Sequence, residues 1–266
     1  MADDNSKLDE LGQVSRIRVK FDGSLDSCGE EKVTWSRQKP KSPEWNRSRG
    51  GKALKLSKES GYPEMEGFRL GGEWTLVAVA KGAPEGEGII WSVGTGRGKG
   101  SRALALAGTG RGGVKLVTWH GRENSAKVLV LKDVPNFSQQ FHVYAVAKTE
   151  DGEISLWVDG KKAGEANNFS GDGFSDNLRF GAFSYLGTAA GLACSDGAEI
   201  DDFRVYDVAL GEAQHLQIAS GNAPWPEGLP VARERVSAYI DTNAVLRLGY
   251  ELPDRIVVGA DGEKRL

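Results

Sequence analysis

Residues 197–220 have the sequence GAEIDDFRVYDVALGEAQHLQIAS, whose hydrophobic period changes part-way along. Its first half alternates in the two-residue period of a β-strand, which places Asp201, Phe203 and Val205 on one face. The opposite face then takes Ile200, Asp202, Arg204 and Tyr206. A carboxylate beside Phe203 and Val205 needs a cation or several hydrogen-bond donors, because burying an uncompensated charge is costly.

The second half of this stretch changes to the period of a short helix. Leu210, Ala213, Leu216 and Gln217 fit one side of that helix, with Ile218 beside them. The pattern therefore predicts a strand that runs through a turn into a short closing helix.

The composition is that of a globular protein rich in tight turns. The 266 residues are 39% hydrophobic and 27% charged, with 36 glycines, a value expected when many short strands are joined by turns. A net charge of −3 gives no reason to expect a nucleic-acid partner. No apolar run reaches the roughly 20 residues of a membrane-spanning helix, so we expect no membrane insertion.

Other strand-like runs occur along the chain without long helical patterns between them, which argues against parallel βαβ units and for an antiparallel sandwich. They are Arg16–Phe21, Trp74–Ala80, Ile89–Val93, Ala103–Ala107, Val114–Trp119, Val128–Leu131, Phe141–Ala147, Ile154–Val158 and Leu178–Ala182. Lys39–Gly51 is interpreted as a polar loop.

Five short motifs resemble, in order, those of the laminin-G-like, concanavalin A-like jelly rolls. They are Phe21-Asp22-Gly23, the loop Asp26–Gly29, the segment Gly51–Leu56, the hairpin Phe141–Val146 with Leu156–Lys161, and the closing strand quoted above. The resemblance covers about residues 15–220 and implies two stacked antiparallel sheets with one short helix after the last strand. It does not imply an activity, because this fold carries lectins, adhesion modules and glycanases.

The resemblance also implies two features at the corner where the first and last strands meet. One is a structural calcium site with Asp22, Asp26 and Asp201 as ligands; the alternative is that these acids cap turns. The other is a disulfide between Cys28 and Cys194, the chain's two cysteines, placed near each other by the expected topology; the alternative is two free thiols.

Motifs for catalysis are incomplete. Gly108–Gly113 satisfies G-x-G-x-x-G, but a strand follows where a dinucleotide site needs a helix, so a hairpin turn is favoured. Glu199-Ile200-Asp201 resembles the start of the laminarinase-type catalytic motif, whose last acid would fall on Phe203, or on Arg204 if a bulge intervenes. The three histidines lie on separate elements and suggest no zinc site.

The candidate ligand-binding residues are Trp45, Arg47, Phe174 and Tyr185, because aromatic rings in polar loops can stack on sugars. Further cations suggest an anionic glycan: Arg97, Lys99, Arg102, Arg111 and Arg122. For each residue the alternative is a packed ring or a solvated charge.

The expected organisation is a polar tail (1–14), a jelly-roll domain (15–220), and a linker with a C-terminal β extension (221–266). We expect a non-catalytic carbohydrate-binding module of a secreted, periplasmic or cell-surface bacterial protein, whose signal peptide is absent here, appended to other domains such as a glycoside hydrolase. The alternatives are an adhesion or assembly module that binds protein, and a glycan hydrolase or lyase with an unrecognised site.

Overall fold

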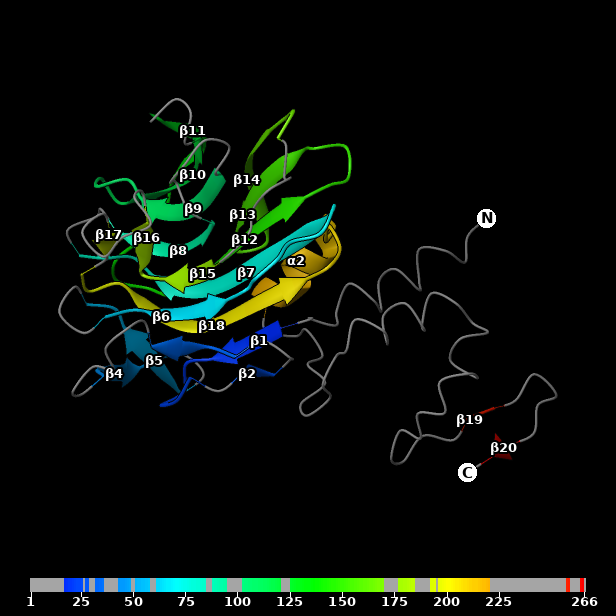
Figure 1. Cartoon of the computed structure of the whole chain (residues 1–266), viewed down its shortest axis with the longest axis horizontal. Helices are drawn as coiled ribbons and strands as arrows, with labels where there is room; N and C mark the ends of the chain where they lie inside the picture. Colours follow the sequence, from blue (N-terminus) through cyan, green and yellow to red (C-terminus); the bar gives the residue numbers. More distant parts are fainter. Residues whose placement is uncertain are drawn as a thin grey trace.

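The chain folds into two stacked antiparallel sheets (Figure 1). The computed structural model describes residues 17–25, 27–28, 32–35, 43–48, 51–57, 61–84, 88–94, 102–120, 125–169, 177–184, 192–194, 196–220, 257–258 and 264–265. Sheet A has the order β14 (Lys161–Ala166), β13 (Ile154–Val158), β12 (His142–Lys148), β7 (Trp74–Lys81), β18 (Glu199–Tyr206), β1 (Ile17–Lys20) and β2 (Ser27–Cys28). β5 (Lys52–Lys55) also pairs with β18, and β4 (Trp45–Arg47) pairs with β5.

Sheet B has the order β11 (Ser125–Asp133), β10 (Gly113–His120), β9 (Arg102–Gly108), β8 (Ile89–Gly94), β15 (Asn177–Phe180), β6 (Pro63–Glu66) and β3 (Thr34–Trp35). Two small antiparallel pairs stand apart from the large sheets: β16 (Ala182–Ser184) with β17 (Leu192–Cys194), and β19 (Val257–Val258) with β20 (Lys264–Arg265). The predicted antiparallel jelly roll is confirmed.

The main core lies between the two sheets and contains their large apolar side chains. Phe180 of sheet B contacts two rings of sheet A edge to face, with ring centroids 5.1 Å from Phe21 and 4.9 Å from Phe203. Trp91 meets Phe203 at 6.4 Å in a similar geometry. Such edge-to-face pairs add to the stabilisation from burial alone, so β18 is anchored across the sandwich.

A β-bulge changes which face of β18 each residue occupies. The register with β7 shifts between Ile200 and Asp202, so that Ile200 joins Phe203 and Val205 in the main core. One extra residue in a strand reverses the alternation on one side of it. The prediction that Asp201 shares the inner face with Phe203 and Val205 is therefore wrong. The residue that shares this face is Ile200.

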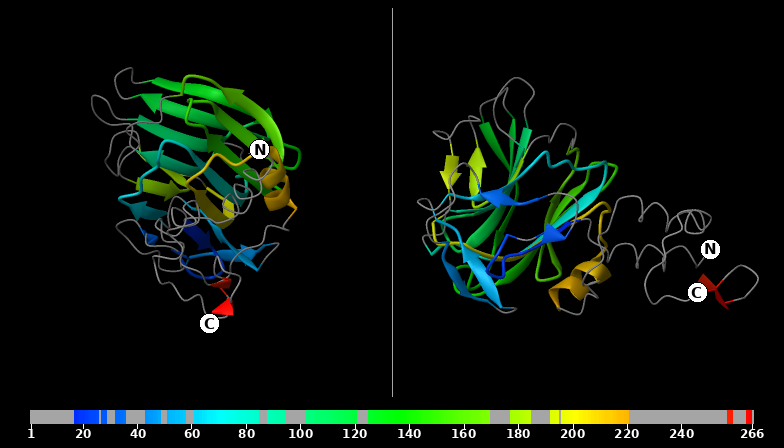
Figure 2. Two further views of the ribbon diagram at one scale, coloured as in Figure 1. Left: turned by 90° about the vertical axis from the view of Figure 1, so that its right-hand side faces the viewer. Right: turned by 60° about the horizontal axis from the view of Figure 1, so that its bottom comes forward.

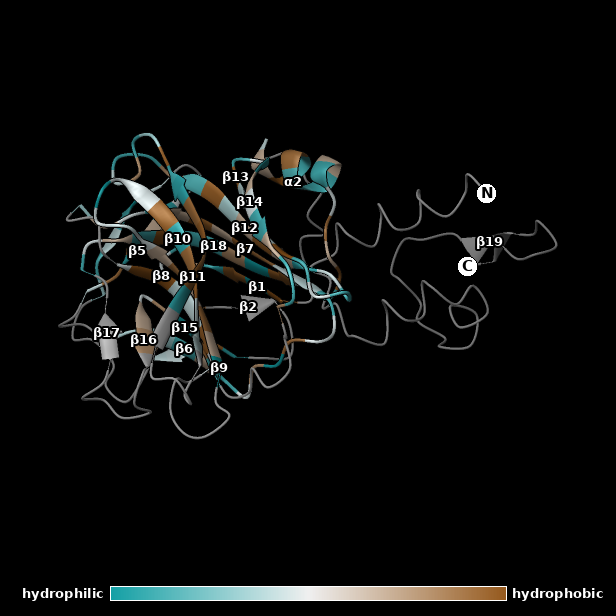
Figure 3. Cartoon of the chain, turned by 90° about the horizontal axis from the view of Figure 1, so that it is seen from above, coloured by the Kyte–Doolittle hydropathy of each residue, from teal (hydrophilic) through white to brown (hydrophobic). Residues whose placement is uncertain are grey.

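The helix α2 (Glu212–Ala219) packs outside the sandwich, against the outer face of sheet A (Figure 2). We use "outer face" for the side of a sheet that is turned away from the other sheet. Ile218 of α2 and Leu210 before it bury a second apolar cluster with Val77, Trp157 and Tyr206. The mixed hydropathy of the helix, visible in Figure 3, fits this one-sided packing.

The strands predicted between Arg16 and Ala182 are present with their ends shifted by a few residues, except that Leu178–Ala182 is divided between β15 and β16. The helix is where its period predicts it, and most of the predicted C-terminal β extension (221–266) lies outside the described residues. No described helix has the length and apolar character of a membrane-spanning segment.

The Gly108–Gly113 motif forms the β9–β10 hairpin turn, with Gly110 and Gly112 at φ of 78° and 84°. The interpretation of Lys39–Gly51 as a loop is wrong at Trp45–Arg47, which form β4.

The predicted disulfide assumed that β1 pairs with β18 and that Cys28 and Cys194 lie at the same end of this pair, and only the first assumption is confirmed. β1 does pair antiparallel with β18, as expected. However, β2 folds back along β1 and places Cys28 opposite Arg18, away from the start of β18. Cys194 lies in β17 opposite Ala182, in a separate small sheet. The expected corner therefore does not bring the two backbones together, and the disulfide stays a prediction without this support.

Candidate functional site

The outer face of sheet A carries a row of buried charged residues along β18. Beyond the bulge, the outward positions are Asp202, Arg204 and Tyr206, and before it Glu199. All of these side chains are at least nine-tenths buried, which is unusual for charged groups unless they are paired. The row divides into two polar groups that have different partners.

The first group, which we call the Glu199 cluster, consists of Asn46, Lys81, Phe141 and Glu199. Lys81 Nζ lies 2.6 Å from Glu199 Oε1, and the Asn46 amide donates to the same oxygen at 3.0 Å. Lys81 Nζ also lies 5.6 Å from the centre of the Phe141 ring, in cation–π range. The cluster thus combines β4, β7, β18 and the residue that precedes β12.

Glu199 keeps one acceptor unused. Its side chain is 6% exposed, and its Oε2 accepts no hydrogen bond from the described residues. An unsatisfied oxygen of a buried carboxylate costs free energy, which a ligand donor such as a hydroxyl group can recover. Phe141 is only half-buried, and its ring lies in cation–π range of Lys81, the ion-pair partner of Glu199.

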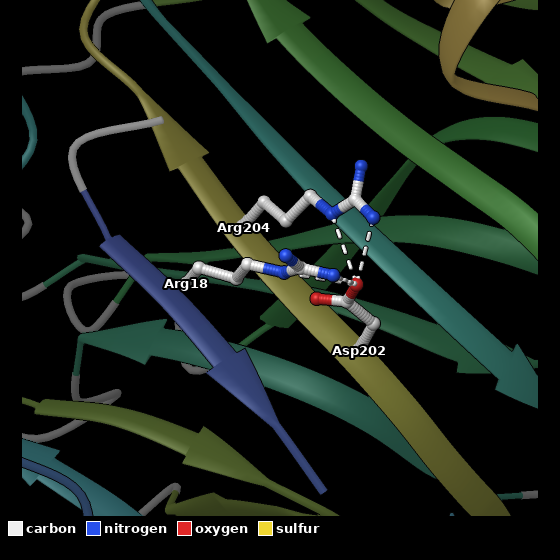
Figure 4. A network of polar contacts seen from close by, with 3 residues as sticks. All are labelled: Arg18, Asp202 and Arg204. Atoms are coloured by element: carbon white, nitrogen blue, oxygen red, sulfur yellow. Dashed lines mark hydrogen bonds and ion pairs between the residues drawn. The ribbon is translucent and has the colours of Figure 1, made fainter. Parts of the chain in front are cut away.

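The second group, the arginine network, consists of Arg18, Asp202 and Arg204 (Figure 4). Arg18 donates to Asp202 Oδ2 through Nε at 3.3 Å and Nη2 at 3.1 Å. Arg204 donates to the same oxygen through Nε at 3.1 Å and Nη2 at 2.7 Å. Burial lowers the pKa of Arg204, while the adjacent Asp202 opposes that shift. This network ties β1 to β18.

The predicted calcium corner is described in part. The main-chain N–H of Lys52 donates to Asp22 Oδ1 at 2.9 Å, as the turn-capping alternative expects. The pKa of Asp201 is raised to about 6, chiefly by burial and then by the charges of Asp202 and Asp22, while Ser48 opposes the shift. Asp26 lies outside the described residues. Among the residues that the structure describes, no three acidic, histidine or cysteine side chains form a set that could hold a metal ion.

The four predicted ligand-binding residues do not form the site together. Trp45 is opposite Leu54 on the inner side of β4 and packs against the main core. Its ring therefore has the packing role that was the alternative to ligand binding. Arg47 is exposed at the end of β4. Phe174 and Tyr185, like Arg97, Lys99 and Arg122, lie outside the described residues.

Sequence reasoning missed Asn46, Lys81 and Phe141 as members of a site. A signal for Asn46 was present, because the residue between Trp45 and Arg47 must face the other way if the segment is a strand. Phe141 opens the hairpin motif that carries the strongest family resemblance. Lys81 ends the strand that begins at Trp74, and nothing in the sequence marks it as a partner of Glu199.

Comparisons with known proteins agree with this architecture. Residues 68–214, more than half of the chain, match the Laminin_G_3 family, described as the concanavalin A-like lectin/glucanases superfamily. The chain belongs to this family. A search of curated protein sequences gave no match.

Solved structures with the same concanavalin A-like fold include bacterial toxin domains. The botulinum neurotoxin serotype D binding domain aligns with a TM-score of 0.58 and 10% identity over 81% of this chain. The botulinum neurotoxin serotype D ligand-binding domain in complex with N-acetylneuraminic acid gives 0.58, 11% and 81%. The binding domain of Paraclostridial Mosquitocidal Protein 1 gives 0.58, 10% and 79%.

The match covers 52%, 52% and 53% of these three domains, so this chain spans about half of their length. At such low identity the likeness shows the fold alone. The comparisons therefore assign a concanavalin A-like sandwich of the kind present in binding domains, and the ligand has to be argued from the residues of this chain.

Proposed function

We propose that this chain is a non-catalytic glycan-binding module of a larger secreted protein, and that its ligand sits on the Glu199 cluster. The observation that carries the proposal is the unused, buried oxygen of Glu199, in a cluster whose Lys81 also contacts the half-buried ring of Phe141. A sugar offers what this combination needs, since its hydroxyl groups donate to a carboxylate and its C–H face packs on an aromatic ring.

The electrostatics of the cluster favour a neutral glycan over an anionic one. The opposite charges of Lys81 and Glu199 neutralise each other, because Lys81 Nζ lies 2.6 Å from Glu199 Oε1. The cluster therefore presents no net positive charge to an acidic sugar. The predicted anionic preference depended on cations of which only Arg47, Arg102 and Arg111 are described. Arg102 and Arg111 belong to the β9–β10 hairpin of sheet B, and Arg47, next to Asn46 on β4, alternates to the opposite side of that strand. We therefore expect neutral sugars with adjacent hydroxyl groups to bind best.

The same geometry supports the absence of glycanase activity. Retaining hydrolysis needs two carboxyl groups about 5 Å apart, one of which must exchange a proton. Because of the bulge at Asp201, Arg204 and not Phe203 shares the outer face with Glu199, and an arginine cannot serve as that acid.

A glycan array with the purified chain, followed by titration of the best ligand, tests this proposal. Glu199→Gln removes the charged acceptor and should weaken the titrated affinity by about tenfold, the usual effect of losing one hydrogen bond to a charged group. The matched control is Glu44→Gln, because Glu44 also pairs with a lysine, Lys55 at 3.0 Å, but is exposed. An array without ligands, or equal losses in both variants, contradicts the proposal.

A further inference from the structure

The Glu199 cluster belongs to an open strip on the outer face of sheet A. The strip consists of two neighbouring rows of outward side chains, each of which crosses β18, β7 and the start of β12. The first, which we call the Glu199 row, contains Glu199, Lys81 and Phe141. The second, the Asp202 row, contains Asp202, Val79 and Val143. The members outside β18 are only partly buried, so both rows reach the surface.

The strip is bounded on both sides of these two rows. Beyond the Asp202 row, the next outward residues are Val77 and Ala145, which are buried in the apolar cluster beneath α2. Val143 packs against the edge of that cluster. Beyond the Glu199 row, the pairing of β7 with β18 stops, since β7 ends at Lys81 and β18 begins at Glu199. The strip therefore has room for two repeats of one kind of surface and not for a third.

Each row presents the same combination of chemical groups. Asp202 is 7% exposed, and its Oδ1, like Oε2 of Glu199, accepts no hydrogen bond from the described residues. The two arginines of the network donate to its other oxygen, Oδ2 (Figure 4). Val79 and Val143 face each other across the β7–β12 ladder and give this row an apolar surface, as Phe141 does in the Glu199 row. A ligand hydroxyl group can recover the free energy that such an unsatisfied buried oxygen costs.

The spacing of the rows fits consecutive units of one chain of sugars. Lys81 and Val79 are two residues apart on β7, so the rows lie about 7 Å apart at a rise of about 3.3 Å per residue. A sugar ring that packs on one row therefore leaves the other row to the next unit of the chain. An acidic unit does not fit there, because its carboxylate would meet Asp202 Oδ1, which can only accept a hydrogen bond.

We propose that the strip binds two consecutive units of a neutral glycan chain, one on each row. This inference rests on the proposed glycan-binding function and specifies the ligand as a disaccharide unit instead of a single sugar. The first unit packs on Phe141 and donates to Glu199, and the second packs on the two valines and donates to Asp202 Oδ1. Because the α2 cluster and the end of the β7–β18 pairing limit the strip, a third unit gains no further contact with it.

Calorimetric titration of the full chain with sugars of increasing length tests the inference. The probes are glucose, galactose, mannose and xylose, each with its disaccharide and its trisaccharide. For the sugar that binds, the disaccharide should bind about tenfold more tightly than the monosaccharide, because the Asp202 row adds a hydrogen bond to a charged group and an apolar contact. The trisaccharide should bind within about twofold of the disaccharide, since it finds no further row. A series in which no probe binds overturns the inference.

A paired variant assigns the second unit to the Asp202 row. Val79→Thr with Val143→Thr keeps strand propensity and replaces a methyl group by a hydroxyl group at each position. The variant should lose most of the gain from monosaccharide to disaccharide and should bind the monosaccharide like the parent. Val128→Thr is the matched control and should keep the full gain, because Val128 is 51% exposed but lies on β11 of the other sheet. Near-UV circular dichroism confirms that each variant keeps its fold.

Failure of this inference can be distinguished from failure of the proposed function. Glu199→Gln should weaken the binding of the monosaccharide and the disaccharide alike, because both occupy the Glu199 row. If that loss is seen but the monosaccharide and the disaccharide bind equally well to the parent, the glycan site stands and the second unit is excluded. An unchanged gain in the Val79/Val143 variant, or a further tenfold gain with the trisaccharide, likewise overturns the arrangement of one unit on each row.

Discussion

Arg18 and Arg204 face each other directly across the β1–β18 ladder, and one oxygen of Asp202 binds both of them. Like charges at directly opposed positions of neighbouring strands repel and destabilise a sheet. The shared carboxylate converts that repulsion into a link between the first strand and the last strand of the sandwich. The pair thus depends on a third residue for its stability.

Replacing that third residue should therefore be costly. Asp202→Asn keeps the shape but leaves two largely buried guanidinium groups without their anion, and we expect the free energy of unfolding to fall by about 3 kcal/mol. Urea denaturation measures this change. Asp133→Asn, at an exposed acid of β11, should change it by less than about 0.5 kcal/mol. A similar small effect at Asp202 would show that the network contributes little.

His142 and Asp159 should make part of the stability depend on pH. His142 Nδ1 lies 2.7 Å from Asp159 Oδ2, and this hydrogen bond, which outweighs desolvation, raises the pKa of His142. A raised pKa in the folded state stabilises the fold below the ordinary value of 6.5, and this contribution is lost as the pH rises through the folded pKa.

Asp159→Asn isolates this effect. Asp159 has φ of 50°, a conformation that asparagine tolerates, so the turn should survive the change. The stability difference between the parent and the variant, measured in urea, should be largest near pH 5.5 and should shrink above neutrality. A difference that stays constant from pH 5.5 to 8.5 would exclude the ion pair as its cause.

His215 should act in the opposite direction. Its ring stacks on Trp157 at 4.3 Å, and burial lowers its pKa to about 4, with a small opposing effect from the Leu210 backbone. The unfolded chain therefore binds the proton more tightly between pH 6.5 and 4, and stability should fall with the pH by up to about 3 kcal/mol.

His215→Phe keeps an aromatic ring on Trp157 and removes the titrating group. Its unfolding free energy should not show this acid loss, whereas the parent should show it in full, with Trp157 reporting through near-UV circular dichroism. Parallel pH profiles for the parent and the variant would contradict this interpretation of His215.

Calcium binding at the β1–β18 corner remains a proposal that a melting curve can test. Binding at about 100 times the dissociation constant would add about 2.7 kcal/mol to stability. A bound cation would also lower the pKa of Asp201, which burial and two neighbouring acids now raise to about 6. Coincident melting curves in calcium and in chelator would contradict the calcium site and leave Asp22 with its turn-capping role alone.

The sequence predicts the sandwich well because alternation and turn residues are local signals. Ile17, Val19 and Phe21 alternate inward, and the structure buries all three completely. The bulge at Asp201 has no such local signal, since it depends on how β18 pairs with β7. It moves Ile200 from the predicted outer face to the inner face. The Glu199 cluster escaped prediction for the same reason, because Asn46 and Glu199 meet only after β4 and β5 join β18.

The proposed sugar packs on Phe141 and donates to Glu199, which calorimetric titration of Phe141→Ala with the best array ligand can test. Loss of the ring should weaken binding by about tenfold or more, because an aromatic contact contributes about 1 kcal/mol beyond its buried area. Leu216→Ala, at an exposed apolar site on α2, should bind like the parent. An unchanged dissociation constant for Phe141→Ala would place the ligand elsewhere on the molecule and contradict the claim.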